Sequence, residues 1–371
     1  MRVIIAAGGT AGHINPGLAI AEKIKKEHPD SDIMFVGRKQ GMEYNLVTKA
    51  GYKFSHMEVT GFQRSFSPEN IKRNLITVKN LLTAGRAADK ILNSFKPDLV
   101  MGTGGYVSGP IVQQAAKRGI KTALHEQNAF AGVTNKILSK HVDKVFVATE
   151  KASKYMANPE KCIPCGNPVR QEITQADTLK AKQELGVEGK LVVLSFGGSL
   201  GAAMVNKAMQ HLALHNKNRE DIVHFHVVGR YDEGEFVKFL NDNEINDENK
   251  IKVYEYLYDI AKYMAAADVI ICRCGALTIA ELSCMGKASI LIPSPNVAEN
   301  HQYHNGKVLE DIGAAILIEE KNLTAETITE SFEKLYQNPQ LIGQMGEKAK
   351  QAHNADCIDI IYNNLVELIK V

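Results

Sequence analysis

The sequence predicts an α/β protein made of two similar domains, each built on a parallel sheet. A glycine-rich loop follows the first strand of each half, at residues 8–12 and 197–201. A second pair of strands, starting at 97–101 and 267–271, shares an aspartate before an apolar run and a glycine loop after it. The length of 371 residues suits two domains of about 150 residues each. Because ligands bind at the carboxyl ends of parallel strands, we expect the loops of both halves to face a shared central cleft.

In the first half, apolar runs separated by glycine turns and amphipathic stretches predict alternating strands and helices. The first helix is expected to begin at Pro16, because proline suits the first helical turn. Residues 166–170 contain an Asn-Pro turn signal and are interpreted as the linker between the domains. The expected strands are 2–7, 32–36, 54–59, 99–102, 121–124 and 145–148, and the expected helices are 16–28, 68–95 and 110–118.

The second half repeats this alternation and ends in a helix that no strand follows. That helix, residues 356–369, is expected to pack back and complete the first domain. The predicted domains are therefore 1–166, completed by 356–369, and 167–355. The expected strands are 191–196, 223–228, 251–254, 269–272 and 289–292, with helices at 202–215 and from about 276 to 285.

The stretch from Asp268 to Gln302 carries the clearest ligand signal. A strand, the Gly275 turn, a helix and another strand form one βαβ unit. The helix N-terminus at the end of the first strand suits an anion, because it presents N–H groups and the positive end of the helix dipole. Glu281, one helical turn further on, suits hydroxyls, as the acidic residue does on the ribose of a dinucleotide. Phosphate at the turn and ribose at Glu281 together predict a nucleotide.

The composition excludes several classes of function. A net charge of +2 does not indicate a nucleic-acid binder. No run of eighteen apolar residues occurs, and the N-terminal apolar segment is too short for a signal peptide. The six cysteines are expected to be reduced thiols, including the dithiol-like Cys162 and Cys165.

The glycine loops do not match the common nucleotide-binding motifs. The loop at residues 8–12 lacks the G-x-G-x-x-G spacing, and neither loop has the G-K-[ST] of a nucleoside triphosphatase. The acidic pair Asp30 and Asp32 precedes its strand, at the wrong end of the sheet for a metal site. We therefore expect a metal-free diphosphate site whose charge is met by Arg170, Ser199 and the two helix N-termini.

The segment from Ile71 to Arg86 has two interpretations. It mixes aliphatic residues with Lys72, Arg73 and Lys79. The simpler interpretation is a helix with one core face and one solvated face. The alternative is an apolar patch ringed by basic residues that lies on an anionic membrane surface.

Taken together, the motifs resemble those of the MurG family, bacterial glycosyltransferases that add N-acetylglucosamine to lipid I to give lipid II. The resemblance covers nearly the whole chain and implies a GT-B fold of two Rossmann-like, doubly wound domains, with the enzyme peripheral to the cytoplasmic face of the cell membrane and with no cofactor. The motifs that carry it are Gly8–His13, Gly104–Pro110, His125–Asn128, Gly166–Arg170, Gly197–Ser199, Gly275–Thr278 and Gln302.

The resemblance assigns ligands to both domains. In the second domain, UDP-N-acetylglucosamine would meet Leu257 at the uracil, and Gln302 at the sugar hydroxyls. In the first domain, the lipid I diphosphate would bind both glycine loops, and Asn128 would lie near the donor sugar. The implied donor residues are Thr10, Ala11, Gly12, Asn128, Arg170, Ser199, Leu257, Ala276, Leu277, Thr278, Ile279, Ala280, Glu281 and Gln302; the implied acceptor residues, beside the loop at Thr10 to His13, are Gly104, Gly105 and Tyr106.

Two residues are candidates for the catalytic chemistry, an inverting displacement in which the acceptor hydroxyl attacks the anomeric carbon and UDP leaves. His13 has a side chain suited to act as general base near neutral pH, although a histidine at a helix start also serves to bind phosphate or cap the loop. Glu126 either orients His13 or holds its own loop. Tyr106 is expected to line a pocket. Four residues depart from the usual family pattern without removing a charged contact: Ala11, Leu200, Cys274 and His301.

Two other functions fit parts of the pattern. A UDP-N-acetylglucosamine 2-epimerase would share the two-domain shape, but it would need acid and base carboxylates in the cleft and no acceptor. A sugar-nucleotide binding module would need only one of the two halves.

The membrane interpretation predicts that changing Lys72, Arg73 and Lys79 together to Glu lowers binding to anionic vesicles. Each basic residue near such a surface contributes about 1 kcal/mol, a contribution that salt screens, while inserted leucines would keep part of the binding in high salt. Vesicle co-sedimentation measures the loss, and activity on a water-soluble acceptor analogue should be kept. Equal sedimentation of variant and parent would remove this segment from the membrane-facing surface.

Overall fold

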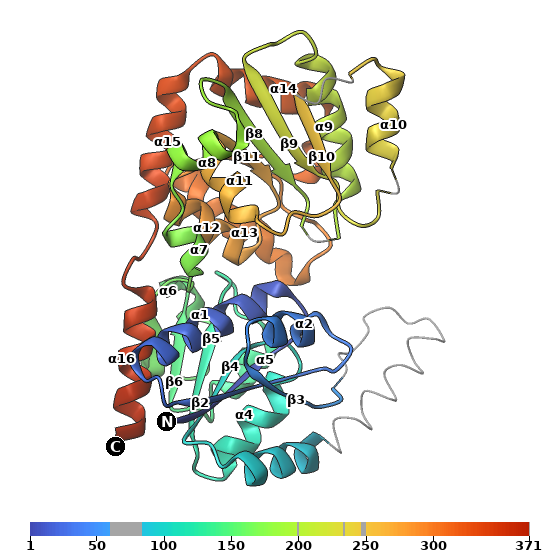
Figure 1. The fold of residues 1–371 in the computed structure, drawn as a ribbon. Coiled ribbons are helices and arrows are strands. Elements are labelled where there is room, and N and C mark those ends of the chain that lie inside the picture. The colour runs from blue at the N-terminus through green and yellow to red at the C-terminus, as the bar shows by residue number, and fades with distance from the viewer. Residues whose placement is uncertain (60–83, 199, 233, 246–249, 371) are drawn as a thin grey trace. The chain divides into compact units, whose positions relative to one another are not determined.

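The chain folds into two compact domains, shown in Figure 1. The first consists of Met1–Arg170 with Asn354–Val371, and the second of Gln171–His353. Ser199 and residues 60–83, which hold most of the predicted membrane-facing segment, lie outside the described residues. The computed structural model describes residues 1–59, 84–198, 200–232, 234–245 and 250–370.

The first domain is built on a seven-stranded parallel sheet with the order β3-β2-β1-β4-β5-β6-β7. Neighbouring residues of β1 point into different cores: Ile5 packs in one buried cluster and Ile4 in the other. The strand order reverses between β1 and β4, the position at which open parallel sheets bind ligands. The strands are β1 Arg2–Ala7, β2 Asp32–Gly37, β3 Lys53–His56, β4 Leu99–Gly104, β5 Lys121–Glu126, β6 Lys144–Val147 and β7 Cys162–Pro164.

Helices cover both faces of this sheet. The C-terminal helix α16 packs beside α1, and its Ile361 and Leu365 are fully buried in the same cluster as Ile5. On the other face, residues 84–95 are helical and bury Ala88 and Leu92. The helices of the domain are α1 Ala11–Glu27, α2 Met42–Lys49, α4 Ser108–Lys117, α5 Val133–Leu138, α6 Glu150–Ser153, the 3-10 turn η1 Pro159–Lys161, and α16 Cys357–Lys370.

Helix α1 begins earlier than the sequence predicted. Thr10 has extended backbone angles at the N-cap, and the amide of His13 donates to its carbonyl at 3.0 Å. Pro16 therefore lies inside the helix, where it removes only the hydrogen bond that its missing N–H would have donated to Gly12. The predicted start at Pro16 is wrong because proline is tolerated early in a helix and does not mark its first residue. As a result His13 stands on a helix and not on a loop.

The second domain has a six-stranded parallel sheet with the order β10-β9-β8-β11-β12-β13. The predicted fold class of two parallel-sheet α/β domains is confirmed. Its strands are β8 Leu191–Phe196, β9 Ile222–Val227, β10 Ile251–Tyr254, β11 Val269–Cys272, β12 Ala288–Leu291 and β13 Ala315–Leu317; its helices are α7 Gln171–Thr174, α8 Thr178–Leu185, α9 Ala203–His215, α10 Glu235–Asp242, α11 Ile260–Ala266, α12 Ala276–Met285, η2 Ala298–Asn300, α13 His301–Asp311, η3 Glu320–Asn322, α14 Ala325–Tyr336 and α15 Pro339–Gln351.

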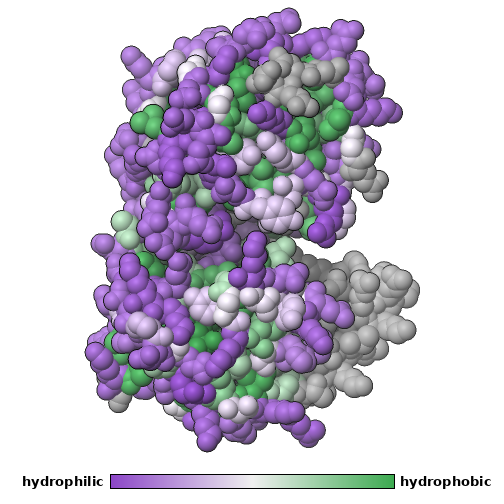
Figure 2. Space-filling view, viewed as in Figure 1, coloured by the Kyte–Doolittle hydropathy of each residue, from purple (hydrophilic) through white to green (hydrophobic). Residues whose placement is uncertain are grey.

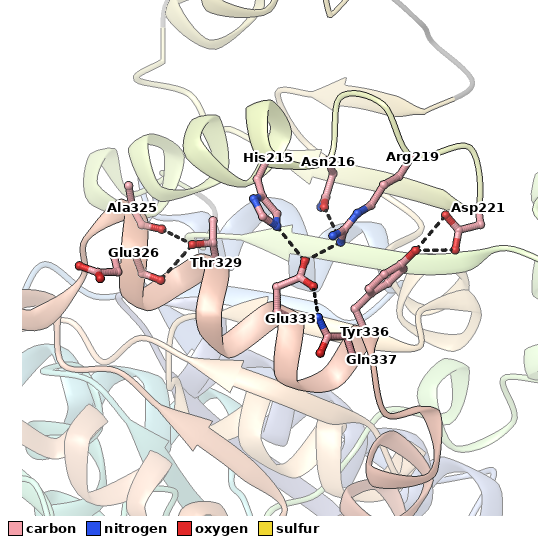
Figure 3. A network of polar contacts seen from close by, with 10 residues as sticks. All are labelled: His215, Asn216, Arg219, Asp221, Ala325, Glu326, Thr329, Glu333, Tyr336 and Gln337. Atoms are coloured by element: carbon pink, nitrogen blue, oxygen red, sulfur yellow. Dashed lines mark hydrogen bonds and ion pairs between the residues drawn. The ribbon is translucent and has the colours of Figure 1, made fainter.

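A polar network joins α9 to α14 near the amino end of β9 (Figure 3). Glu333 accepts hydrogen bonds from His215 Nε2 at 2.7 Å and pairs with Arg219 at 2.6 Å. The guanidinium of Arg219 also lies 4.1 Å from the ring centre of Tyr336, whose hydroxyl donates to Asp221 at 3.0 Å. These contacts join α9 and α14 at the amino ends of the strands, which is the edge of the sheet opposite to their carboxyl ends.

On the face shown in Figure 2, hydrophilic side chains cover most of the surface, and apolar side chains lie in scattered patches. Within the described part of the chain, no helix has both the length and the apolar character needed to cross a bilayer.

The core of the second domain contains two buried histidines. Ser195 Oγ lies 2.7 Å from Nε2 of His224 and 2.7 Å from Nδ1 of His226. Burial lowers the pKa of His224 to about 4 and that of His226 well below its usual range, because an imidazolium there would lose its hydration. Both rings are therefore neutral in the folded domain at pH 6, whereas the unfolded chain already binds protons at that pH.

The buried pair predicts acid sensitivity of the second domain. Stability contributed by neutral His224 is present above pH 6.5 and is lost as pH falls toward about 4, since only the unfolded state gains protons in that window. Between pH 7 and pH 5 the parent should lose up to about 2 kcal/mol of opening free energy that a His224→Gln variant keeps. Amide hydrogen exchange of β8 and β9 measures this loss. The exposed His141→Gln variant is the control and should follow the parent; equal slopes for all three proteins would contradict the prediction.

Candidate functional site

Two glycine loops meet at the carboxyl ends of β1 and β4. A Cβ atom on Gly105 would lie 2.2 Å from the carbonyl oxygen of Gly8, and one on Gly104 would lie 2.3 Å from Nδ1 of His13. Both residues also have positive φ, 118° for Gly104 and 82° for Gly105, which favours glycine. Glycine is therefore required at both positions. The contact brings together, at one edge of the first sheet, the predicted residues Thr10, Ala11, Gly12, His13, Gly104, Gly105 and Tyr106.

The imidazole of His13 packs against Gly104 at this edge. Thr103 Oγ1 donates to the His13 carbonyl at 2.7 Å, and Nδ1 of the ring lies 3.2 Å from Oε1 of Gln127. Burial lowers the pKa of His13, because the imidazolium loses hydration; the hydrogen bond that the ring donates to Gln127 Oε1 and the negative charge of Glu126 oppose this shift. The ring is therefore neutral near pH 7 and can accept a proton.

Glu126, at the end of β5, uses its carboxylate to hold the loop that follows. Oε1 accepts from the backbone N–H of Asn128 at 3.0 Å and from its Nδ2 at 3.1 Å. Oε2 accepts from the Gly132 amide and from Asn135 Nδ2, both at 2.9 Å. With the side chain buried and both oxygens engaged, these contacts favour the loop-holding role over a direct one on His13.

The remaining first-domain candidates lie around this edge. Tyr106 is 57% exposed, so its ring is available to a ligand. Asn128 is half-buried directly after Gln127. Gln127 itself, which the sequence analysis did not single out, provides the contact to the His13 ring. The available signal was the run of four polar residues after a buried strand, but the motif alone does not say which of the four reaches His13.

In the second domain, α12 begins at the carboxyl end of β11. Gly275 is its N-cap with extended backbone angles, and Gly286 ends it in the left-handed conformation. The amide of Ile279 makes the first helical hydrogen bond, to Gly275 at 2.9 Å, so the first turn points toward this edge of the sheet. Here the structure brings together Ala276, Leu277, Thr278, Ile279, Ala280 and Glu281; Leu277 is buried and the others are half-buried.

Two side chains hold the segment that follows β12. Arg273 donates to the carbonyls of Ile292 and Pro293, each at 3.2 Å, and pairs with Glu320. Gln302, at the start of α13, accepts from the Ser294 amide at 2.9 Å through Oε1. Arg273 was not predicted. The sequence carries little indication of a role for Arg273, because a single arginine after a strand is usually a surface residue.

The loops after β8 and β9 in the second domain pack as closely as the glycine loops of the first domain. A Cβ atom on Gly201 would lie 2.3 Å from the carbonyl oxygen of Val228, so the loops after β8 and β9 touch. Leu257 is buried in the loop after β10. Arg170 ends the first segment of the first domain, and Ser199 lies outside the described residues.

The cysteines do not form a metal site. All six are free thiols. Among the residues that the structure describes, no group of three or more His, Cys, Asp or Glu side chains is placed to hold a metal ion. Cys274, one of the departures from the family pattern, is buried, and burial raises the pKa of its thiol.

Comparison with known proteins gives full-length matches. The glycosyltransferase family 28 N-terminal domain matches residues 3–147, and the glycosyltransferase family 28 C-terminal domain matches residues 192–361. A protein of Acetivibrio thermocellus named UDP-N-acetylglucosamine--N-acetylmuramyl-(pentapeptide) pyrophosphoryl-undecaprenol N-acetylglucosamine transferase is 40% identical, covering 100% of this chain and 99% of its own length. A protein of Clostridioides difficile with the same name is 41% identical, covering 99% and 89%.

Solved structures agree in fold. The crystal structure of Acinetobacter baumannii MurG superimposes with a TM-score of 0.76 at 29% identity, covering 99% of each chain. A UDP-GlcNAc 2-epimerase from Neisseria meningitidis, bound to UDP-GlcNAc, gives a TM-score of 0.70 at 14% identity, covering 99% of this chain and 100% of its own. At that identity the epimerase shows a likeness of fold alone.

Proposed function

The chain belongs to the MurG family of glycosyltransferases, within glycosyltransferase family 28, and we propose that it transfers N-acetylglucosamine from UDP-N-acetylglucosamine to the muramyl sugar of lipid I, giving lipid II for peptidoglycan synthesis. The observation that carries this proposal is identity of about 40% over the full length to relatives named for that reaction. The identity extends over both domains. It therefore includes the domain proposed for each substrate and is not limited to a nucleotide-binding domain.

We assign the donor to the second domain. The N-terminus of α12 at the end of β11 suits the UDP diphosphate, because the positive end of the helix dipole favours an anion. Glu281, one turn along the helix, is placed to accept hydrogen bonds from ribose hydroxyls. Leu257 would meet the uracil, Gln302 the sugar, and Arg170 and Ser199 the diphosphate.

We assign the acceptor to the first domain. The loops that hold Gly8 and Gly105 meet at this edge, where backbone N–H groups would bind the lipid I diphosphate. Neutral His13 takes the proton as the acceptor oxygen attacks the anomeric carbon. The bond from that carbon to the UDP oxygen breaks, and the diphosphate charge meets Arg170 and the helix N-terminus. A single displacement of this kind inverts the configuration at the anomeric carbon.

The epimerase alternative has less support. The relatives at about 40% identity are named transferases, whereas the epimerases resemble the chain at 12–14% identity. Both oxygens of Glu126, a carboxylate in the first-domain site, are engaged by its own loop, which does not favour a role on a substrate as the acid or base of an epimerase.

We place the enzyme at the cytoplasmic face of the cell membrane as a peripheral protein. The relatives' name includes an undecaprenol acceptor, whose lipid tail stays in the bilayer. The first domain, which is proposed to hold the acceptor site, would then face the anionic membrane surface. The basic segment named above is the candidate contact.

Mass spectrometry of reaction mixtures tests the function. With UDP-N-acetylglucosamine and a lipid-linked muramyl acceptor, the proposal predicts UDP and a glycosylated acceptor, and no change in the donor when the acceptor is left out. An isomerised amino sugar formed without acceptor would support the epimerase, and no product in either mixture would leave only sugar-nucleotide binding.

Replacing Glu281 tests the ribose assignment. Glu281→Ala should weaken UDP binding by roughly 2–4 kcal/mol, because buried ribose hydroxyls lose a charged partner. Calorimetric titration with UDP measures the change, with the exposed glutamate variant Glu330→Ala on α14 as the control. An unchanged affinity of Glu281→Ala for UDP would contradict the ribose assignment.

A further inference from the structure

The amide of Gln127 lies at the centre of a buried chain of polar contacts between two histidines. Its Nε2 atom is 2.7 Å from the carbonyl oxygen of Thr103, 3.1 Å from that of His125 and 2.9 Å from Nδ1 of His125. Its Oε1 atom is 3.2 Å from Nδ1 of His13. The side chain is 97% removed from solvent, so water does not compete for these partners.

These partners fix which end of the amide faces which histidine. A backbone carbonyl oxygen only accepts, so the atom facing Thr103 and the His125 carbonyl must be the amide nitrogen. A flipped amide would bring its oxygen against both carbonyl oxygens and lose the hydrogen bonds that its nitrogen donates to them, which costs free energy. The amide oxygen therefore faces His13, and because it has no proton to give, Nδ1 of His13 must carry one.

The far end of the chain supports the same assignment independently. Nε2 of His125 lies 3.1 Å from the carbonyl oxygen of Gly166, which also only accepts. Nε2 of His125 therefore carries a proton, and Nδ1, which lies 2.9 Å from the amide nitrogen of Gln127, faces a donor and acts as an acceptor. The tautomers of both histidines and the orientation of the amide are mutually consistent in this arrangement.

We propose that Gln127 is a positioning residue that holds His13 as the Nδ1–H tautomer and so leaves its Nε2 lone pair to take the proton of the acceptor hydroxyl. The proposal rests on the assigned base role of His13. Gln127 touches neither substrate in this role; it acts through the imidazole, whose approach Gly104 permits by lacking a side chain.

A neutral amide suits this position better than a carboxylate. Burial lowers the pKa of His13 and keeps the ring ready to accept a proton; the Gln127 oxygen then stabilises the imidazolium that forms. Besides burial, the ring is influenced by the Gln127 side chain, the negative charge of Glu126 and the backbone of Thr103. A second carboxylate at residue 127 would raise the pKa and leave the base protonated at a higher pH.

NMR of the protein labelled with ¹⁵N in its histidine side chains tests the tautomer directly, with the His13 signals assigned by their loss in His13→Gln. The parent should show His13 protonated on Nδ1 and bare on Nε2. Gln127→Met, similar in volume but unable to accept, should lose that preference and turn over about 10- to 10³-fold more slowly. Gln183→Met, an exposed change on α8, is the control and should match the parent.

Gln127→Glu keeps the oxygen that faces His13 but loses the hydrogen bonds to the Thr103 and His125 carbonyls, so it tests the acceptor separately by partial rescue. It should retain the Nδ1–H tautomer, recover turnover relative to Gln127→Met above neutral pH, and move the acid limb of the kcat/KM profile to higher pH. A parent His13 protonated on Nε2, or a Gln127→Glu profile at the parent's position, would overturn the proposal. The tautomer is read without substrate, so a parent that transfers no sugar would refute the proposed function and leave this result standing separately.

Discussion

The close approach of two backbones is the constraint on which the first-domain site depends. Gly105 lies against the carbonyl of Gly8, where any Cβ atom would be 2.2 Å from the oxygen. This contact joins the loops after β1 and β4, at the point where the strand order reverses. With the loops in contact, the first turn of α1 places His13 against Gly104 and within reach of Gln127. A side chain at either glycine would separate the loops and move the imidazole from its partner.

The second domain contains the same device with different side chains around it. Gly201 and Gly229 bring the loops after β8 and β9 together as closely as the first pair, and α12 starts at the neighbouring strand. Its loops hold no histidine in that position; they offer a helix N-terminus and the carboxylate of Glu281. The two domains thus share a fold but present different chemistry, which fits one domain for an acceptor that must lose a proton and the other for a nucleotide that must leave.

The parallel sheets could be predicted because strands buried on both faces are continuous apolar runs, and the glycine loops because only glycine permits such contacts. The start of α1 was misplaced, since proline at residue 16 is compatible with both a first and a later turn. Gln127 and Arg273 were missed for a different reason. Their roles depend on Thr103, His13 and Glu320, which are distant in sequence, and no local pattern records those distances.

The central claim is that His13 serves the acceptor reaction and takes no part in holding the donor. The most direct measurement is transfer by the His13→Ala variant under donor saturation, with its UDP affinity measured in parallel. The account predicts turnover reduced roughly 10²- to 10⁴-fold, the range for loss of a general base, with UDP affinity close to that of the parent. Weakened UDP binding with turnover per bound donor preserved would contradict it.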